Sequence, residues 1–136
     1  MDPLATTKTH AQRLVDEAMA RHPELVSLAM HVTLPGSQDN IILGSSFGRI
    51  GKKGDDDDML VIRTGKELED VYDAGKRYGL ELPLQDGPGE TIGALTVAYA
   101  YKAGADKPAL RHRAEQLRDE LRKEIMSAQQ LVAFDP

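Results

Sequence analysis

The chain contains no cysteine and no tryptophan, and its aromatic residues are limited to two phenylalanines and four tyrosines. Without cysteine it has no disulfide, no thiol nucleophile and no thiolate ligand for zinc. With so few aromatic rings it has no obvious stacking platform for nucleobases. These shortages exclude disulfide-stapled folds and thiol catalysis, and they argue against a surface for single-stranded nucleic acid.

Long apolar runs and an excess of positive charge are also missing. No apolar stretch approaches the roughly 20 residues that a membrane helix needs, so no membrane segment is predicted in this chain. Acidic residues outnumber basic ones by 22 to 17, which gives a net charge of −5 and argues against binding to phosphate backbones. The remaining composition, with 40% hydrophobic residues over 136 positions, predicts a single domain spanning residues 1–136.

The most informative stretch is a predicted β-hairpin. Two runs rich in strand-forming residues, Arg77–Gln85 and Thr91–Tyr101, are joined by the turn residues Asp86–Gly89. In the second run Leu, Val and Tyr alternate with Ala and Thr, which is the period of a strand with two different faces. We expect a helix to cover the face with large side chains, whereas the face with small side chains leaves space.

The rest of the chain supplies helices at both ends and further strands between them. The apolar spacing predicts an N-terminal helix at about 8–22 and a C-terminal helix at about 107–130. Strands are expected at Leu25–Leu34, Asn40–Ser46 and Glu67–Tyr72, with a short helix from Asp55 to Ile62. Short strands without helical crossovers in the second half favour an α+β fold with a five-stranded antiparallel sheet. The two long helices would then lie on one face, and the short helix and loops on the other.

Several segments occur in an order and spacing that resembles the middle of Cache domains, the PAS-like extracytoplasmic sensor domains of bacteria. They are Ile42–Ser46, Arg49–Lys53, the acidic helix start, Thr64–Lys66, Glu81–Leu84 with Asp86–Gly87, and Thr91–Leu95. This resemblance implies a PAS-like fold that binds a small molecule without chemistry, often a carboxylate, an amino acid or an amine. It also implies a periplasmic or exported protein whose signal segment is not present in this chain, with a cytoplasmic location as the alternative.

A basic loop is the first candidate for contact with the ligand. Arg49 and Lys52 precede the start of the short helix, where cationic side chains and unpaired backbone N–H groups together stabilise anions. The alternative is a solvated loop whose cations pair with the aspartates of Asp55–Asp58.

Three polar residues are predicted to meet on the small-residue face of the sheet. His31 and Thr96 would hydrogen-bond a polar ligand. Glu81 would be a partly buried carboxylate that needs a partner, which could be Arg49, His31 or an amine of the ligand. The alternatives are a core histidine satisfied by the protein itself, and a glutamate at a solvent-facing edge.

Ser45 and Tyr78 complete the predicted ligand-binding set, the serine as a hydrogen-bonding group and the tyrosine as part of a pocket wall. Tyr99 shares a face with Leu95 and Val97, so it is assigned to the core. The four consecutive aspartates lack the alternating ligands of a calcium-binding EF-hand, and they suit a helix start better. No metal and no cofactor are therefore predicted.

These observations favour a non-catalytic sensor domain that binds a small metabolite in a pocket on the sheet face, and we expect this metabolite to be an anion such as an organic acid or amino acid. The alternative is a structural or dimerisation module without a ligand, in which the short helix fills the small-residue face. A homodimer is compatible with both hypotheses. An enzyme is the third hypothesis. It ranks behind the other two because the chain has no nucleophile elbow, phosphate-binding loop or histidine pair at metal-ligand spacing.

Overall fold

The computed structural model describes residues 8–135, so residues 1–7 and 136 of the predicted domain lie outside the described part. Its elements confirm the predicted α+β class and follow in the order α1 (His10–Arg21), β1 (Leu25–Thr33), β2 (Asn40–Ser45), α2 (Asp56–Thr64), β3 (Leu68–Tyr72), β4 (Arg77–Gln85), β5 (Thr91–Ala100), α3 (Lys107–Arg122) and α4 (Ala128–Val132). None of the helices in this part has the length and apolar composition needed to cross a membrane.

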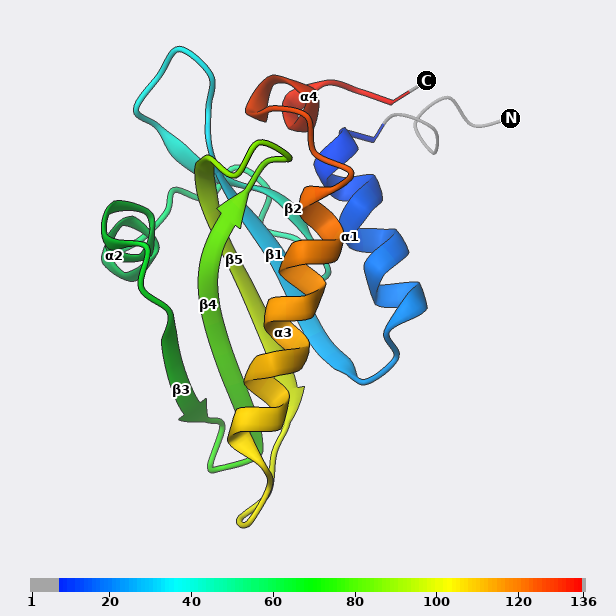
Figure 1. The fold of residues 1–136 in the computed structure, drawn as a ribbon, viewed down its shortest axis with the longest axis vertical. Coiled ribbons are helices and arrows are strands. Elements are labelled where there is room, and N and C mark those ends of the chain that lie inside the picture. Colours follow the sequence, from blue (N-terminus) through cyan, green and yellow to red (C-terminus); the bar gives the residue numbers. More distant parts are fainter. Residues whose placement is uncertain (1–7, 136) are drawn as a thin grey trace.

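The five strands form one antiparallel sheet in the order β2-β1-β5-β4-β3. The predicted hairpin is β4 and β5, which pair along almost their whole length at the centre of the sheet (Figure 1). Thr96 of β5 lies opposite Ala29 of β1 on one side and Glu81 of β4 on the other. Because side chains alternate along each strand, this register places all three on the same face.

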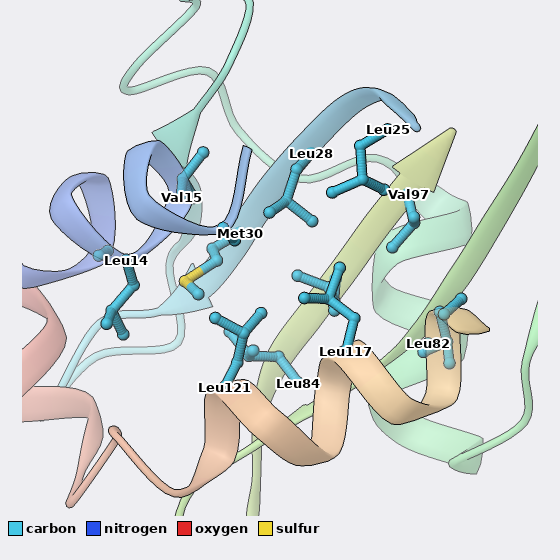
Figure 2. Close-up of a cluster of buried hydrophobic side chains, with 14 of the residues drawn as sticks. Leu14, Val15, Leu25, Leu28, Met30, Leu82, Leu84, Val97, Leu117 and Leu121 are labelled. Atoms are coloured by element: carbon cyan, nitrogen blue, oxygen red, sulfur yellow. The ribbon is translucent and has the colours of Figure 1, made fainter. Parts of the chain in front are cut away.

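Helices α1 and α3 cover the opposite face of the sheet, here called the inner face, and enclose the core (Figure 2). The amphipathic stripes of both helices meet large side chains from β1, β4 and β5, as the alternation of the hairpin predicts. Tyr99 is buried here, which confirms its assignment to the core. Fully buried members include Leu14, Val15, Leu28, Met30, Leu82, Leu84, Leu95 and Leu121.

Helix α1 approaches the sheet closely because β2 has a glycine at the contact. A Cβ atom on Gly44 would lie 2.8 Å from the backbone oxygen of Ala11. Next to this contact, the side chain of Gln12 replaces a missing strand neighbour, since it accepts from the Ser45 N–H and donates to the Ser45 carbonyl, both at 2.9 Å. The glycine and the glutamine together fix the position of α1 on the sheet.

The C-terminal helix is shorter than predicted, because the single helix expected at 107–130 is two helices. Helix α3 ends at Arg122, and Ser127 caps α4 by accepting from the Gln130 N–H. The backbone between them makes tertiary contacts, since the Ile125 carbonyl accepts from the Gly87 N–H at 2.7 Å. Ile125 itself is buried in the core. An uninterrupted helix would use this carbonyl internally, so the contact with the β4–β5 turn accounts for the break.

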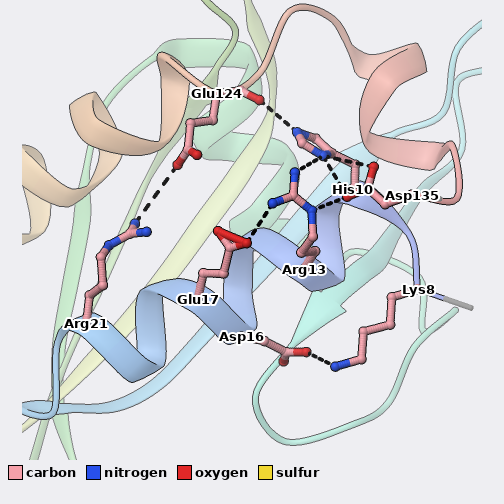
Figure 3. Close-up of polar contacts among 8 residues, drawn as sticks. All are labelled: Lys8, His10, Arg13, Asp16, Glu17, Arg21, Glu124 and Asp135. Carbon is pink, nitrogen blue, oxygen red and sulfur yellow. Dashed lines mark hydrogen bonds and ion pairs between the residues drawn. The ribbon is translucent and has the colours of Figure 1, made fainter. Parts of the chain in front are cut away.

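The two ends of the described chain are fastened together, with Thr9 bridged to Phe134. Buried His10 contacts the Asp135 carboxylate through Nδ1 and the Glu124 carbonyl through Nε2 at 2.8 Å (Figure 3). Arg13 also binds Asp135. The sequence analysis gave His10 no role, and the structure shows that it joins α1 to the segment around α4.

Substitution of Gly44 by alanine should destabilise the fold by about 1–3 kcal/mol, because the added methyl group collides with backbone rather than with a movable side chain. Urea denaturation measures the change in the free energy of unfolding. Thr91→Ala, which also places an alanine in a strand but at an exposed position, should stay within about 0.5 kcal/mol of the wild type. Equal effects of the two substitutions would contradict the close approach of α1.

Candidate functional site

The face of the sheet opposite α1 and α3, here called the outer face, has small side chains at its centre. Most residues in register across β1, β5 and β4 on this face are serine, alanine, threonine and glycine, with His31, Glu81 and Pro83 as the larger exceptions. Helix α2 packs on β4 and β5 over part of this face and leaves the rest open. The space that remains is a candidate binding cleft.

This cleft has a volume of about 520 Å³, which is within the range of small-molecule sites. Its floor is formed by the strands, and the first turn of α2 and the loop after β2 contribute to its walls. The lining residues are Ser27, Phe47, Asp57, Leu68, Glu69, Asp70, Tyr72, Gly79, Leu80, Glu81, Thr96, Val97 and Ala98.

Helix α2 lies at the edge of the cleft, and both of its ends are defined by capping residues. Asp55 accepts from the Asp58 N–H at 2.9 Å, and the Asp58 carboxylate accepts in return from the Asp55 N–H at 2.8 Å, which is a capping box. Gly65 ends the helix with a φ of 72°, a conformation that suits glycine. These features confirm the predicted helix start, and the helix ends at Thr64, two residues beyond the predicted Ile62.

Asp58 has a second role that the sequence did not reveal. Its side chain is buried against the outer face, where Oδ2 lies 3.2 Å from Nδ1 of His31 without the alignment of a hydrogen bond. On the other side of the imidazole, Nε2 of His31 lies 3.4 Å from Oγ1 of Thr96. Thr96, His31 and Asp58 therefore form a continuous row of polar groups between the cleft and α2.

Glu81 lies next to this row and has no positively charged partner among the described residues. Its Oε2 atom is buried and receives no hydrogen bond from a protein donor. Burial, together with the neighbouring Asp58 carboxylate, raises the pKa of Glu81 to about 9. Glu81 is consequently protonated at neutral pH, and in this form it donates a hydrogen bond to Asp58.

The two neighbours of Glu81 show the opposite direction of shift. Burial lowers the pKa of His31, which outweighs the attraction of Asp58, so the imidazole is neutral near pH 7. Burial alone would raise the pKa of Asp58, but hydrogen bonds from Glu81 and from the Asp55 backbone lower it below its ordinary value. The cluster thus contains one ionised carboxylate, one protonated carboxyl group and one neutral imidazole.

Of the seven residues predicted to contact a ligand, the structure brings His31, Glu81 and Thr96 together on the outer face. Glu81 and Thr96 line the cleft, and buried His31 lies directly behind Thr96. Their shared face is the arrangement that the strand alternation predicts. Their contact with a ligand stays a prediction.

Ser45 and Tyr78 lie elsewhere. Ser45 is buried at the end of β2, where its hydroxyl accepts from the Phe47 N–H at 3.0 Å. Tyr78 is fully buried in the core on the inner face, because it has the same strand parity as Leu80. Its hydroxyl donates to Glu69 at the edge of the sheet. Neither residue lines the cleft.

The predicted cationic residues Arg49 and Lys52 also lie outside the cleft, in the exposed loop between β2 and α2. Arg49 has a φ of 63°, so the loop turns sharply at this position. The loop then pairs with the edge of the sheet, where Gly51 N–H donates to the Ile42 carbonyl at 2.8 Å. This pairing keeps both cations at the rim of the β2 edge, and neither forms an ion pair with Glu81 as the sequence analysis suggested for Arg49.

The cleft has residues outside the predicted ligand-binding set. Phe47, Asp57 and Asp70 had no predicted role there, and Tyr72 is a tyrosine whose ring suits a pocket wall but which the sequence analysis did not include in the set. Phe47 lies two residues after the end of β2, and Tyr72 ends β3, so both positions could only be assigned once the strands were placed. Phe47 is 47% exposed and Tyr72 is 42% exposed, so both rings are accessible from the cleft. Among residues 8–135, no group of three or more histidine or acidic side chains is arranged to hold a metal ion.

Comparisons with known proteins support the fold. No protein-family model and no curated protein sequence matches the chain. The structure is similar to the crystal structure of the A. aeolicus nlh2 GAF domain in an inactive state, with a TM-score of 0.60 and 16% sequence identity over 86% of this chain and 83% of that one. It is also similar to the repressor BlcR from Agrobacterium tumefaciens, with a TM-score of 0.53 and 11% identity over 85% and 66% of the two chains. The fold is therefore of the GAF/PAS-like kind, and the narrower Cache resemblance stays a prediction.

The raised pKa of Glu81 predicts that stability falls as pH rises. Between about pH 6.5 and 9 the folded chain keeps the Glu81 proton, whereas the unfolded chain, with its pKa near 4.5, has released it. The melting temperature should fall by roughly 2–6 °C per pH unit in this window. Glu81→Gln should remove most of this slope and be more stable than the wild type at pH 8, as measured by scanning calorimetry.

The matched control is Glu90→Gln, which removes an exposed carboxylate at the β4–β5 turn and should leave the slope unchanged. A wild-type melting temperature that rises between pH 6.5 and 9, or a Glu81→Gln variant that is less stable at pH 8, would contradict the assignment.

Proposed function

We propose that this chain is a sensor domain that binds a small molecule in the outer-face cleft and carries out no chemistry on it. The observation that carries the proposal is the cleft itself, which is open beside a buried carboxyl group without a cationic partner. Groups whose pKa is strongly shifted in a cleft are enriched at functional sites. The similarity of the fold to that of a repressor supports a regulatory role.

Keeping Glu81 in this place costs stability, and that cost supports a functional role. A glutamine of the same shape would satisfy the same space without the need to hold a proton at neutral pH. Buried polar groups that lower stability are typical of sites where function requires them. The ligand would compensate for the missing partner.

The sequence analysis expected an anion balanced by Arg49 and Lys52. No lysine or arginine lines the cleft, which does not favour an anion there. Binding of an anion to the exposed 49–53 loop stays a prediction. The export of the protein also stays a prediction. The ligand of the cleft is therefore inferred from the cleft's own residues.

A screen by thermal shift tests the proposal. A ligand of the folded chain should raise the melting temperature by mass action, by roughly 2 °C or more at saturating concentration. Ala98→Leu, which adds bulk to the floor of the cleft, should abolish this shift, whereas Ala103→Leu in the exposed loop after β5 should retain it. If no organic acid, amino acid, amine or sugar gives a shift that depends on Ala98, the binding role is lost.

A second candidate function, hydrolysis, is favoured by one specific arrangement. The row Thr96, His31 and Asp58 has the order of a hydroxyl nucleophile, a base and an orienting carboxylate. Two features oppose it: Nδ1 of His31 is not hydrogen-bonded to Asp58, and the nucleophile would be a β-branched threonine within a strand. A structural or dimerisation module without a ligand is a further alternative, because α2 covers part of the outer face.

Hydrolysis of p-nitrophenyl acetate separates a sensor from a hydrolase. We expect the wild type to be no faster than its His31→Ala and Thr96→Val variants, because the row is not aligned for proton transfer. A rate more than about tenfold above both variants would favour the hydrolase instead. Sedimentation at a series of dilutions would reveal a dimer.

A further inference from the structure

The charge of the cleft points to one class of ligand. Its lining includes four acidic residues and no lysine or arginine. One of them, Glu69, is paired in register with Leu80, so its side chain lies toward the inner face, where its carboxylate is 2.8 Å from Arg111 of α3. The others, Asp57, Asp70 and Glu81, form no ion pair with any residue that the structure describes. The cleft is thus a region of negative potential without an internal counter-charge.

The aromatic residues of the cleft support the same class. Phe47 and Tyr72 both line it and are both largely accessible. The Tyr72 ring reaches over the floor, because a Cβ atom on Gly79 would lie 3.0 Å from its Cε1 atom. Accessible aromatic faces next to carboxylates attract organic cations, through the electron-rich ring and through ionic contact. Gly79 and Ala98 add a flat apolar floor on which such a molecule can lie.

Glu81 distinguishes most sharply between classes of ligand. Without a ligand, its carboxyl group is neutralised by a proton and not by a basic side chain. Its buried Oε2 atom has no protein donor, and the nearest charged group is the Asp58 carboxylate rather than a cation. A positively charged group in the cleft would take over the function of that proton. A cation is therefore the kind of ligand that can replace this proton, whereas a neutral molecule or an anion cannot.

We propose that the ligand of the cleft is a small organic cation, an amine or a quaternary ammonium compound, whose charged group lies toward Glu81 and whose apolar part contacts Phe47 and Tyr72. The proposal rests on the sensor function stated above and assigns the chemical class of the ligand. An ammonium group with N–H bonds would also donate to Glu81, whereas a quaternary one would rely on the rings and on charge alone.

Binding of a cation in this place releases a proton. Glu81 is surrounded by Asp58, Asp57 and Asp55 at the start of α2, by His31 of β1 and by Thr96 of β5. The aspartates favour its protonated form, the imidazole is neutral, and the register neighbour on β3 is the uncharged Leu68. A bound cation reverses this balance and favours the ionised form. The affinity should therefore rise with pH, by up to about tenfold per pH unit between pH 6.5 and 9.

The experiment compares cations with molecules of the same shape. Choline is paired with uncharged 3,3-dimethylbutan-1-ol, and benzylamine with benzyl alcohol and anionic benzoate, each titrated into the full chain by calorimetry at pH 6.5, 7.5 and 8.5. We expect at least one cation to bind at least tenfold more tightly than its uncharged counterpart. The pair that responds distinguishes a quaternary ammonium compound from an amine.

Variants connect this binding to the proposed residues. Glu81→Gln, which should be more stable than the wild type at pH 8, should weaken the cation at least tenfold at pH 8.5 and remove the pH dependence. Phe47→Ala should weaken choline more than benzylamine, because the quaternary group has no N–H to donate. Glu90→Gln should leave all affinities unchanged.

The outcomes separate the ligand class from the sensor function. If uncharged or anionic partners bind as tightly as the cations and Ala98→Leu abolishes their binding, the organic-cation proposal is wrong while the sensor function stands. If the cations bind but Glu81→Gln has no effect on affinity or on pH dependence, the proposed position of the charge is wrong. If none of the five compounds binds at millimolar concentration, the proposal for the ligand class fails.

Discussion

The Glu81 carboxyl group is buried next to another carboxylate, and no basic side chain neutralises it. This constraint determines the chemistry of the outer face. Because two ionised carboxylates cannot share the site, Glu81 holds a proton and Asp58 carries the charge. The neutral His31 beside them cannot remove the imbalance, since its own burial lowers its pKa. On the outer face, the second carboxyl group is therefore neutralised by a proton and not by a basic side chain.

The same constraint connects the cleft to helix α2. Asp58 caps the N-terminus of α2 and at the same time contacts His31 and Glu81. A change in the charge of Glu81 consequently acts on a residue of the capping box at the start of the helix. The inner face has no comparable feature, since its large side chains are enclosed by α1 and α3. One side of the sheet provides stability, and the other holds the groups that respond to their surroundings.

Much of this arrangement follows from the sequence, because strand alternation is a local property. The alternation in the β4–β5 hairpin placed Glu81 and Thr96 on one face and Tyr99 in the core, and the Asp55 and Gly65 signals located α2. The same parity rule assigns Tyr78 to the core with Leu80, so its placement in a pocket wall contradicted information that the sequence already contained.

Other features depend on contacts between distant segments and could not be predicted in this way. The burial of Asp58 against His31 requires the position of α2 on the sheet, and the exposure of Arg49 requires the path of a loop with an unusual φ. The break between α3 and α4 arises from the bond between Ile125 and Gly87, although the apolar stripe continues past it. In each case one tertiary contact outweighs a correct local pattern.

The protonation state of Glu81 can be measured directly by NMR, from the pH dependence of its side-chain carboxyl carbon shift in the folded chain. Our account predicts that this carbon titrates with a midpoint near pH 9, far above the ordinary value of 4.5 for glutamate. A midpoint close to 4.5 would mean that the carboxylate is compensated or solvated, and it would contradict the electrostatic basis of the proposed cleft.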